Sequence, residues 1–407
     1  MLMRRGHGPA GRRLALLAVI ALAVGLALLL AHRSLQATSA PASGHIVPRA
    51  SAPAVLAPAQ PAVASTGGGA ATPTAPAPAA PKVSDSKLLG QRIMVGLDGT
   101  SPSQALLDAV RNGQVGSVIL FAANIVDRPQ ITALTSSLQR AARAGGNPPV
   151  LIAIDQEGGQ VKRFPYGPPF LSPPQMAQRG SVSEAYRQGA LTGGYLRARG
   201  INWDLAPVLD VPTYPNAFIW QQGRAFSFDS GAVARYAGGF ARGVQSAGIA
   251  ATGKHFPGVG SAAVDTDNQL NELRPTASQR RGALVPYRSL IGRGLDSVML
   301  STAGFPAYDS TGRPTALSPT MIRGLLRGQL GFQGVTITDS LNSPTGHDEI
   351  TAGVLAAQAG ADVLLFIDSA PGELGSLLRA LHGGRIGRAD AVASYERIVA
   401  LKHKVAR

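Results

Sequence analysis

The sequence predicts a (β/α)8 barrel of the TIM type over residues 84–407, and two observations lead to this prediction. Eight short apolar runs rich in Val, Ile and Leu alternate with segments whose apolar residues recur at helical spacing. Apolar strands separated by helices indicate a parallel sheet with helices on its outer faces. Eight such units in about 320 residues favour a closed barrel, and a doubly wound sheet is the alternative.

The expected strands are, in chain order, RIMVGL from Arg92, VGSVILF from Val115, PVLIAID from Pro149, INWDLAPVLDV from Ile201, GIAATGKHF from Gly248, LDSVMLST from Leu295, GVTITDS from Gly334 and ADVLLFID from Ala361. A helix is expected in DSGAVARYAGGFARGVQSAG, whose apolar residues at helical spacing are Val233, Tyr236, Phe240 and Val244.

Charged residues gather at the C-terminal ends of these strands: Asp155, Asp210, Lys254, His255, Asp339 and Asp368. In a barrel these ends form the active-site face, so charge concentrated there is expected of an enzyme. The alternative is that one or two of the aspartates cap the following helix.

The N-terminal region predicts export. Two pairs of arginine precede the uncharged apolar stretch 14–31, and a basic flank before a membrane-length segment is typical of a signal or anchor. We therefore expect residues 1–31 to be a membrane anchor or signal segment, and residues 32–83, rich in Ala, Pro, Ser, Thr and Gly, to be a flexible disordered linker. The expected location is the cell membrane, single-pass, with the folded domain outside the cytoplasm. Cleavage near Ala37 or Ala40 would give a secreted protein instead.

Composition narrows the classes of function. The chain has no Cys, which excludes disulfides and thiolate metal sites. About half of the net charge of +15 lies in residues 1–84, which carry seven Lys or Arg and no acid. The remaining positive charge is spread singly and only 5% of residues are aromatic, so nucleic acid is not an expected partner.

Two strand ends suit a polar ligand. The run ending at Asp155 continues as DQEGGQVKR, where two glycines allow a tight turn before Lys162 and Arg163. A carboxylate beside a guanidinium suits a ligand with several hydroxyl groups. In GKHFPGVG, Lys254 and His255 precede a loop rich in Pro and Gly and are candidates to hold hydroxyl or carbonyl groups of the ligand.

Asp339 ends the apolar strand in TITDSLN and is placed like a nucleophile. A carboxylate there can attack an anomeric carbon if a second group about 5–5.5 Å away protonates the leaving oxygen. The chain has no P-loop, GxGxxG, HExxH or nucleophile-elbow motif, so nucleotide-binding, zinc-protease and serine-hydrolase functions are not supported.

With DQEGG, KHFPG and the strand-end TD in this order, the sequence resembles glycoside hydrolase family 3, specifically its single-domain bacterial β-N-acetylhexosaminidase branch. The resemblance covers about residues 88–402, and MVGLDG at Met94, APVLDV at Ala206, GRAF at Gly223 and GFQGVTITD at Gly331 agree with it. It implies a barrel and a retaining mechanism with a covalent intermediate on Asp339.

By motif position, the resemblance also implies a sugar pocket lined by Asp155, Arg163, Arg224, Lys254 and His255. The implied substrate is a carbohydrate with a terminal β-linked N-acetylglucosamine, commonly from peptidoglycan fragments, and the implied enzyme is a glycosidase of the β-N-acetylhexosaminidase type (EC 3.2.1.52). No metal or cofactor is implied, since retaining hydrolysis needs two side chains and water. We expect a monomer.

Three positions depart from the branch. Its loop after KHFPG ends in Asp-Ser-His, where the His is the general acid/base and the Asp orients it. Here Asp265 aligns with that Asp, and Asp267 stands in place of the His. Thr302 stands where a His is usual, and Ser343 where Met is common.

Three hypotheses address the missing His. Asp267, or its neighbour Asp265, serves as the acid/base, because two close aspartates can share a proton and raise one pKa. Alternatively, an acid arrives from elsewhere, such as Glu272, or the protein binds or senses glycans with little or no turnover. Asp is also shorter than His, so the loop would have to lie closer to the sugar.

Overall fold

The computed structural model describes residues 83–367 and 372–406 of the 407-residue chain. The predicted membrane segment (1–31), all of the predicted linker (32–83) except its last residue, and Asp368 lie outside the described residues. Within the described part of the chain, no helix combines the length and the apolar character needed to cross a membrane.

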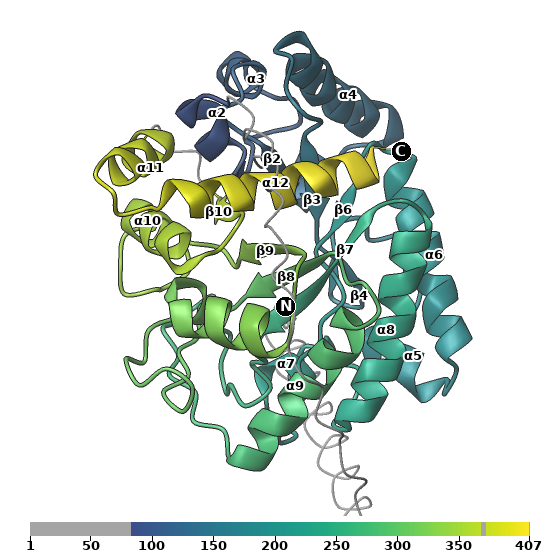
Figure 1. Ribbon diagram of the computed structural model, residues 1–407. Coiled ribbons are helices and arrows are strands. Elements are labelled where there is room, and N and C mark those ends of the chain that lie inside the picture. The colour runs from purple at the N-terminus through teal and green to yellow at the C-terminus, as the bar shows by residue number, and fades with distance from the viewer. Residues whose placement is uncertain (1–82, 368–371, 407) are drawn as a thin grey trace, which may run out of the picture. The chain divides into compact units, whose positions relative to one another are not determined.

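Eight parallel strands form a sheet that is nearly closed into a barrel (Figure 1). They are β1 (Ile93–Val95), β2 (Ser117–Leu120), β3 (Leu151–Ile154), β6 (Trp203–Asp204), β7 (Ala250–Phe256), β8 (Ser297–Leu300), β9 (Val335–Thr338) and β10 (Leu364–Phe366). The order around the sheet is β10, β1, β2, β3, β6, β7, β8, β9. A parallel bridge between Ile337 and Val363 joins the two end strands. Each strand lies within one of the eight predicted runs, so the predicted barrel is confirmed and the doubly wound alternative is wrong.

Helices follow the strands and cover the outside of the barrel. They are α2 (Asp85–Gly90), α3 (Gln104–Arg111), η1 (Ala122–Asn124), α4 (Arg128–Ala144), α5 (Pro173–Gln178), α6 (Val182–Arg197), α7 (Phe218–Gln221), α8 (Ser230–Ser246), α9 (Ala277–Ile291), η2 (Thr315–Leu317), η3 (Thr320–Gln329), α10 (Glu349–Ala359), α11 (Glu373–His382) and α12 (Arg388–Val405). The predicted helix is α8, which buries Val233, Phe240 and Val244 and half-buries Tyr236.

Helix α12 crosses the N-terminal end of the barrel (Figure 1). Its Ile398, Leu401 and Val405 pack against side chains inside the barrel, among them Met94 and Trp203. Burial of such side chains stabilises this end through the hydrophobic effect. The strand ends that carry the candidate site lie at the opposite, C-terminal end of the barrel.

A short hairpin, β4 (Gln156–Gly158) and β5 (Val161–Lys162), follows β3 directly and lies outside the barrel sheet. Gln156 holds the chain after it, because its side-chain amide donates to the carbonyl oxygen of Pro168 at 2.7 Å. Its side-chain oxygen accepts from the backbone amides of Arg163 and Phe164. The hairpin thereby brings Arg163 back toward the strand end that carries Asp155.

Candidate active site

The C-terminal ends of the strands surround a cavity of about 230 Å³. All eight residues that the sequence predicts for the site line it: Asp155, Arg163, Arg224, Lys254, His255, Asp265, Asp267 and Asp339. Apolar side chains complete the wall, among them Phe121, Met299 and Leu365. A cavity with an apolar wall and convergent polar groups is the usual form of a small-ligand site.

Lys254 forms the centre of a buried ionic network. Its Nζ lies 2.7 Å from Oδ1 of Asp155 and 2.7 Å from Oε1 of Glu157. Burial alone would lower the pKa of Lys254, but the two carboxylates outweigh it and raise this pKa. Lys254 is therefore a fixed positive charge that holds both carboxylates in place.

The two carboxylates on Lys254 each have an arginine partner as well. Oδ2 of Asp155 lies 3.1 Å from Nη2 of Arg163. Glu157 receives two hydrogen bonds from Arg224, from Nε at 2.9 Å and from Nη2 at 2.8 Å. Burial would raise the pKa of Glu157, but Arg224 and Lys254 lower it to about 2. The pKa of Asp155 is likewise lowered, because Lys254 and Arg163 outweigh its burial.

His255 lies against a fully buried partner, Asp210. Its Nδ1 is 2.7 Å from Oδ2 of Asp210, and Oδ1 of Asp210 accepts from the backbone amides of His255 and Val259. Burial would lower the pKa of His255, but the Asp210 carboxylate outweighs it and raises this pKa. In the neutral ring, Nδ1 donates to Asp210 and Nε2 accepts from Nη2 of Arg224 at 3.3 Å.

Lys254 and His255 are consecutive residues of a strand, yet both line the cavity. Side chains of a regular strand alternate between its two faces. The pairing of β7 with β8 shifts register between Gly253 and Phe256, and such an irregularity redirects side chains. The local sequence KHFPG thus delivers two polar groups to the cavity from one strand end.

Asp339 follows the last residue of β9 and is partly buried. Its Oδ1 accepts from the backbone amide of Ser340 at 2.9 Å, and it caps no helix, because the N-cap of α10 is Asp348. Burial and the charge of Asp267 raise the pKa of Asp339 to about 6, against the opposing effect of His255. At neutral pH Asp339 is therefore mostly ionised and poorly solvated, as a carboxylate nucleophile needs to be.

The loop 265–267 lies on the same cavity. Oδ2 of Asp265 accepts from Nε2 of Gln222 at 3.0 Å, and its Oδ1 accepts from the backbone amide of Asp267 at 3.2 Å. Oδ1 of Asp267 accepts from Oγ of Ser343 at 2.9 Å. Glu272, the alternative acid, is exposed, pairs with Arg274 and is not among the residues that line the cavity.

The barrel and this cavity can now be compared with known proteins. The family described as Glycosyl hydrolase family 3 N terminal domain matches residues 85–401. The chain belongs to glycosyl hydrolase family 3. The resemblance predicted from the sequence motifs is thereby confirmed.

Relatives of this family 3 protein agree in the type of enzyme. A beta-hexosaminidase of Stenotrophomonas maltophilia (strain K279a) is 34% identical over 291 residues, which are 67% of this chain and 82% of that protein. An uncharacterized secreted glycosyl hydrolase of Arthroderma benhamiae is 33% identical over 329 residues, 78% of this chain and 92% of that protein.

Among solved structures, a glycoside hydrolase family 3 beta-N-acetylglucosaminidase from Paenibacillus sp. str. FPU-7 matches with a TM-score of 0.75 and 34% identity, over 80% of this chain and 63% of that chain. This family 3 protein is a glycosidase of the β-N-acetylhexosaminidase type.

If Asp339 is the nucleophile, the kcat/KM of this family 3 glycosidase is expected to fall as the pH drops through about 6, because only the ionised carboxylate can attack. The charge of Asp267 raises the pKa of Asp339, so Asp267→Asn should move this acidic limb to lower pH. The measurement is kcat/KM against pH for 4-nitrophenyl N-acetyl-β-glucosaminide, whose leaving group needs little protonation. A limb that does not move in Asp267→Asn would show that Asp267 does not act on Asp339.

Sequence reasoning missed the roles of several residues in this family 3 site. Glu157 stands in the quoted motif DQEGG without a role, although residues two apart in an extended segment share a face, which would have linked it to Asp155. Asp210 is recognised as a strand end, but its pairing with His255 is not. Gln222 has no signal in the sequence, because its contact with Asp265 depends on how two loops meet.

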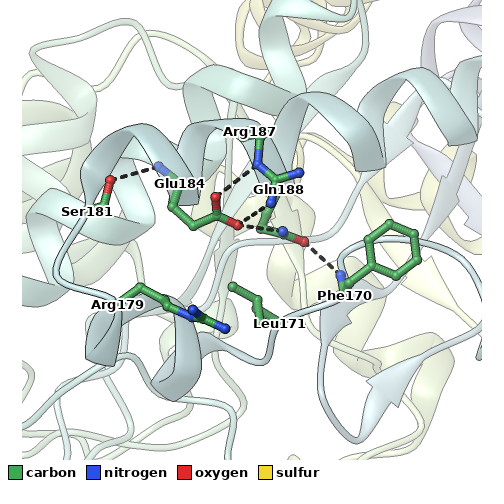
Figure 2. Close-up of a pocket in the computed structure, with 7 residues that line it drawn as sticks. All are labelled: Phe170, Leu171, Arg179, Ser181, Glu184, Arg187 and Gln188. Carbon is green, nitrogen blue, oxygen red and sulfur yellow. Dashed lines mark hydrogen bonds and ion pairs between the residues drawn. The ribbon is translucent and has the colours of Figure 1, made fainter.

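A second and larger cavity, about 420 Å³, lies beside the start of α6 and contains Phe170 and Arg179 (Figure 2). Its carboxylate, Glu184, is bound by both Nε and Nη2 of Arg187, as the dashed lines in Figure 2 show. Glu184 also accepts from the amide of Gln188 at 2.7 Å. Among the described residues, Glu184 is the one carboxylate that lines this cavity, so the described lining lacks the pair that retaining hydrolysis requires.

Proposed function

We propose that this protein is a retaining glycosidase that removes terminal β-linked N-acetylhexosamine from cell-wall glycans through a covalent intermediate on Asp339. One observation carries the proposal: Asp339 and Asp267 line the same cavity, and the charge of Asp267 raises the pKa of Asp339. Retaining hydrolysis needs two such groups close together on one sugar. The names of the relatives support N-acetylhexosamine as the sugar.

In this proposal the ionic network binds the sugar. Asp155 keeps lone pairs that can accept from sugar hydroxyls, while Arg163, Arg224 and Lys254 hold the carboxylates in one orientation. His255, fixed by Asp210, offers Nε2 to the ligand beside Arg224. Because these side chains are already held by one another before a ligand binds, binding costs little further side-chain conformational entropy.

The proposed reaction has two steps. First, in the form of the pair whose one proton lies on Asp267, the Asp339 carboxylate attacks C1 of the sugar, the bond from C1 to the leaving oxygen breaks, and Asp267 transfers its proton to that oxygen. Second, ionised Asp267 takes a proton from water, the water oxygen attacks C1, and the ester bond to Asp339 breaks. Asp265 orients the loop, since it accepts from the backbone amide of Asp267 and from Gln222.

We also propose that the enzyme acts outside the cytoplasm. The basic flank and the apolar stretch 14–31 support a membrane anchor with an extracytoplasmic enzyme domain, or a secreted enzyme if that segment is cleaved. A relative is described as secreted. Antibodies against the barrel should detect the full chain in washed membranes if the segment is an anchor, and a shortened chain in the culture medium if the segment is cleaved.

Asp267→Ala is expected to slow hydrolysis of a methyl N-acetyl-β-glucosaminide by roughly 10²–10⁴-fold, because this leaving group must be protonated. The 4-nitrophenyl glycoside should lose much less in its first step. Azide should restore turnover and yield a β-glycosyl azide, since azide attacks the intermediate without a base. The measurement is the rate of each substrate for the full chain, with and without azide.

Glu272→Ala is the matched control, because Glu272 is an exposed carboxylate paired with Arg274 and lies outside the cavity lining. It should leave all of these rates unchanged. If Glu272→Ala, rather than Asp267→Ala, separates the two substrates, Asp267 is not the acid. A wild-type protein that binds N-acetylglucosamine but hydrolyses neither substrate would instead support the glycan-binding alternative.

A further inference from the structure

Three positions that depart from the family pattern lie together in the structure. Ser343 donates from Oγ to Oδ1 of Asp267 at 2.9 Å. Thr302 donates from Oγ1 to the backbone carbonyl of Thr266, the residue before Asp267, at 3.4 Å. The replaced residues are thus neighbours in one contact group around the loop 265–267.

The side chain of Asp267 is exposed, so its orientation depends on what it contacts. Its backbone is fixed, because its amide donates to Asp265. Within the described residues, Ser343 is the hydrogen-bond partner of its carboxylate, and Oδ2 of Asp267 has no hydrogen-bond partner there. Ser343 is itself nearly buried, with 7% of its surface exposed, so its hydroxyl is held firmly.

We propose that Ser343 is a positioning residue for Asp267: its hydroxyl holds Oδ1 and thereby directs Oδ2 to the leaving oxygen. This inference rests on the proposed function, in which Asp267 carries the proton. Ser343 lies in the loop that follows Asp339, so one segment of the chain bears the nucleophile and holds the acid. The hydrogen bond suits both steps, because Oδ1 accepts whether Oδ2 carries the proton or not.

The contact also limits where the short side chain of Asp267 can lie. Asp is shorter than His, and a misplacement of about 1 Å can cost on the order of 100-fold in rate. An exposed Asp without a partner would divide its time among several rotamers. A hydrogen bond to one oxygen selects one of them, and a hydroxyl on the nucleophile's own loop is well placed to do so.

The test compares Ser343→Ala, Ser343→Thr and Asp267→Ala/Ser343→Ala with wild type in the full chain. Ser343→Ala should lower kcat/KM for the methyl glycoside by about 10- to 100-fold and have little effect on kcat/KM for the 4-nitrophenyl glycoside, because kcat/KM reports the first step, in which only the methyl glycoside's leaving group needs a proton. Ser343→Thr, which keeps the hydroxyl, should restore most of the rate. In the Asp267→Ala background, the Ser343→Ala change should have no further effect.

Thr345→Ala is the matched control, since it removes a buried hydroxyl from the same loop. This hydroxyl donates to the carbonyl oxygen of His347 and not to Asp267. It should not lower kcat/KM for the methyl glycoside more than for the 4-nitrophenyl glycoside. The inference is overturned if Ser343→Ala lowers kcat/KM equally for both substrates, or if it still lowers kcat/KM in the Asp267→Ala background, while the Asp267→Ala results above stand. If wild type hydrolyses neither substrate, the proposed function fails and this inference fails with it.

Discussion

Asp339→Ala is expected to reduce turnover of N-acetyl-β-glucosaminides by about 10⁴-fold or more, since removal of a catalytic nucleophile has effects of this order. Asp339 would form the bond to C1, because the other carboxylates among the described residues that line the cavity would each lose a partner in doing so. Asp155 and Glu157 pair with cations, Asp265 accepts from Gln222 and Asp267 accepts from Ser343. The loss should be as large for the 4-nitrophenyl glycoside as for the methyl glycoside. Steady-state rates with both substrates measure it.

The control for this variant is Asp348→Asn, which removes a carboxylate from the loop after β9 but leaves the cavity unchanged. Asp348 is the N-cap of α10 and accepts from the backbone amide of Thr351 at 2.9 Å, and Asn caps helices about as well. Its activity should match wild type. If Asp339→Ala retains most of its activity on the 4-nitrophenyl glycoside, the covalent mechanism on Asp339 is wrong.

The cavity has two parts with different charge balance. In one part the carboxylates of Asp155 and Glu157 are matched by Lys254 and arginines, so their charge is fixed and the pKa of each is lowered. In the other part, Asp339 and Asp267 form no ion pair with a cation of the described residues, and the charge of Asp267 raises the pKa of Asp339. A matched network suits binding, whereas an unmatched pair suits proton and glycosyl transfer.

The strands were predictable because each lies in a run dominated by apolar and β-branched residues, as expected of a buried parallel strand. The strand-end charges were predictable for the same reason, since Asp155, Lys254 and Asp339 interrupt or end such runs. The contacts of Ser343 and Gln222 with the loop 265–267 were not predictable from the sequence. Their contacts join loops far apart in the sequence, and a small polar residue in a loop has no pattern that reveals its partner.

Lys254→Met is expected to lower the free energy of unfolding by about 3–5 kcal/mol at neutral pH, because it leaves two buried carboxylates without their shared cation. The side chain of Lys254 is 3% exposed and that of Glu157 is fully buried, so solvent cannot replace the lost charge. Urea denaturation of both proteins measures the difference. Arg274→Met, which breaks the exposed pair with Glu272, is the control and should cost at most about 1 kcal/mol.

The pH dependence of this deficit identifies its cause. In wild type, the pKa of Glu157 is about 2, below its unfolded value of about 4.3, so its stabilising contribution is present above the unfolded value and is lost as the pH falls through 2. Without Lys254, each carboxylate keeps only its arginine partner, so the pKa values of Glu157 and Asp155 should be higher than in wild type and both should bind protons at higher pH in the folded variant. The difference in the free energy of unfolding between wild type and Lys254→Met should therefore become smaller as the pH falls from neutral toward about 4. A difference in the free energy of unfolding that stays constant over this range would mean that lost packing of the lysine stem, rather than loss of the shared cation, causes it.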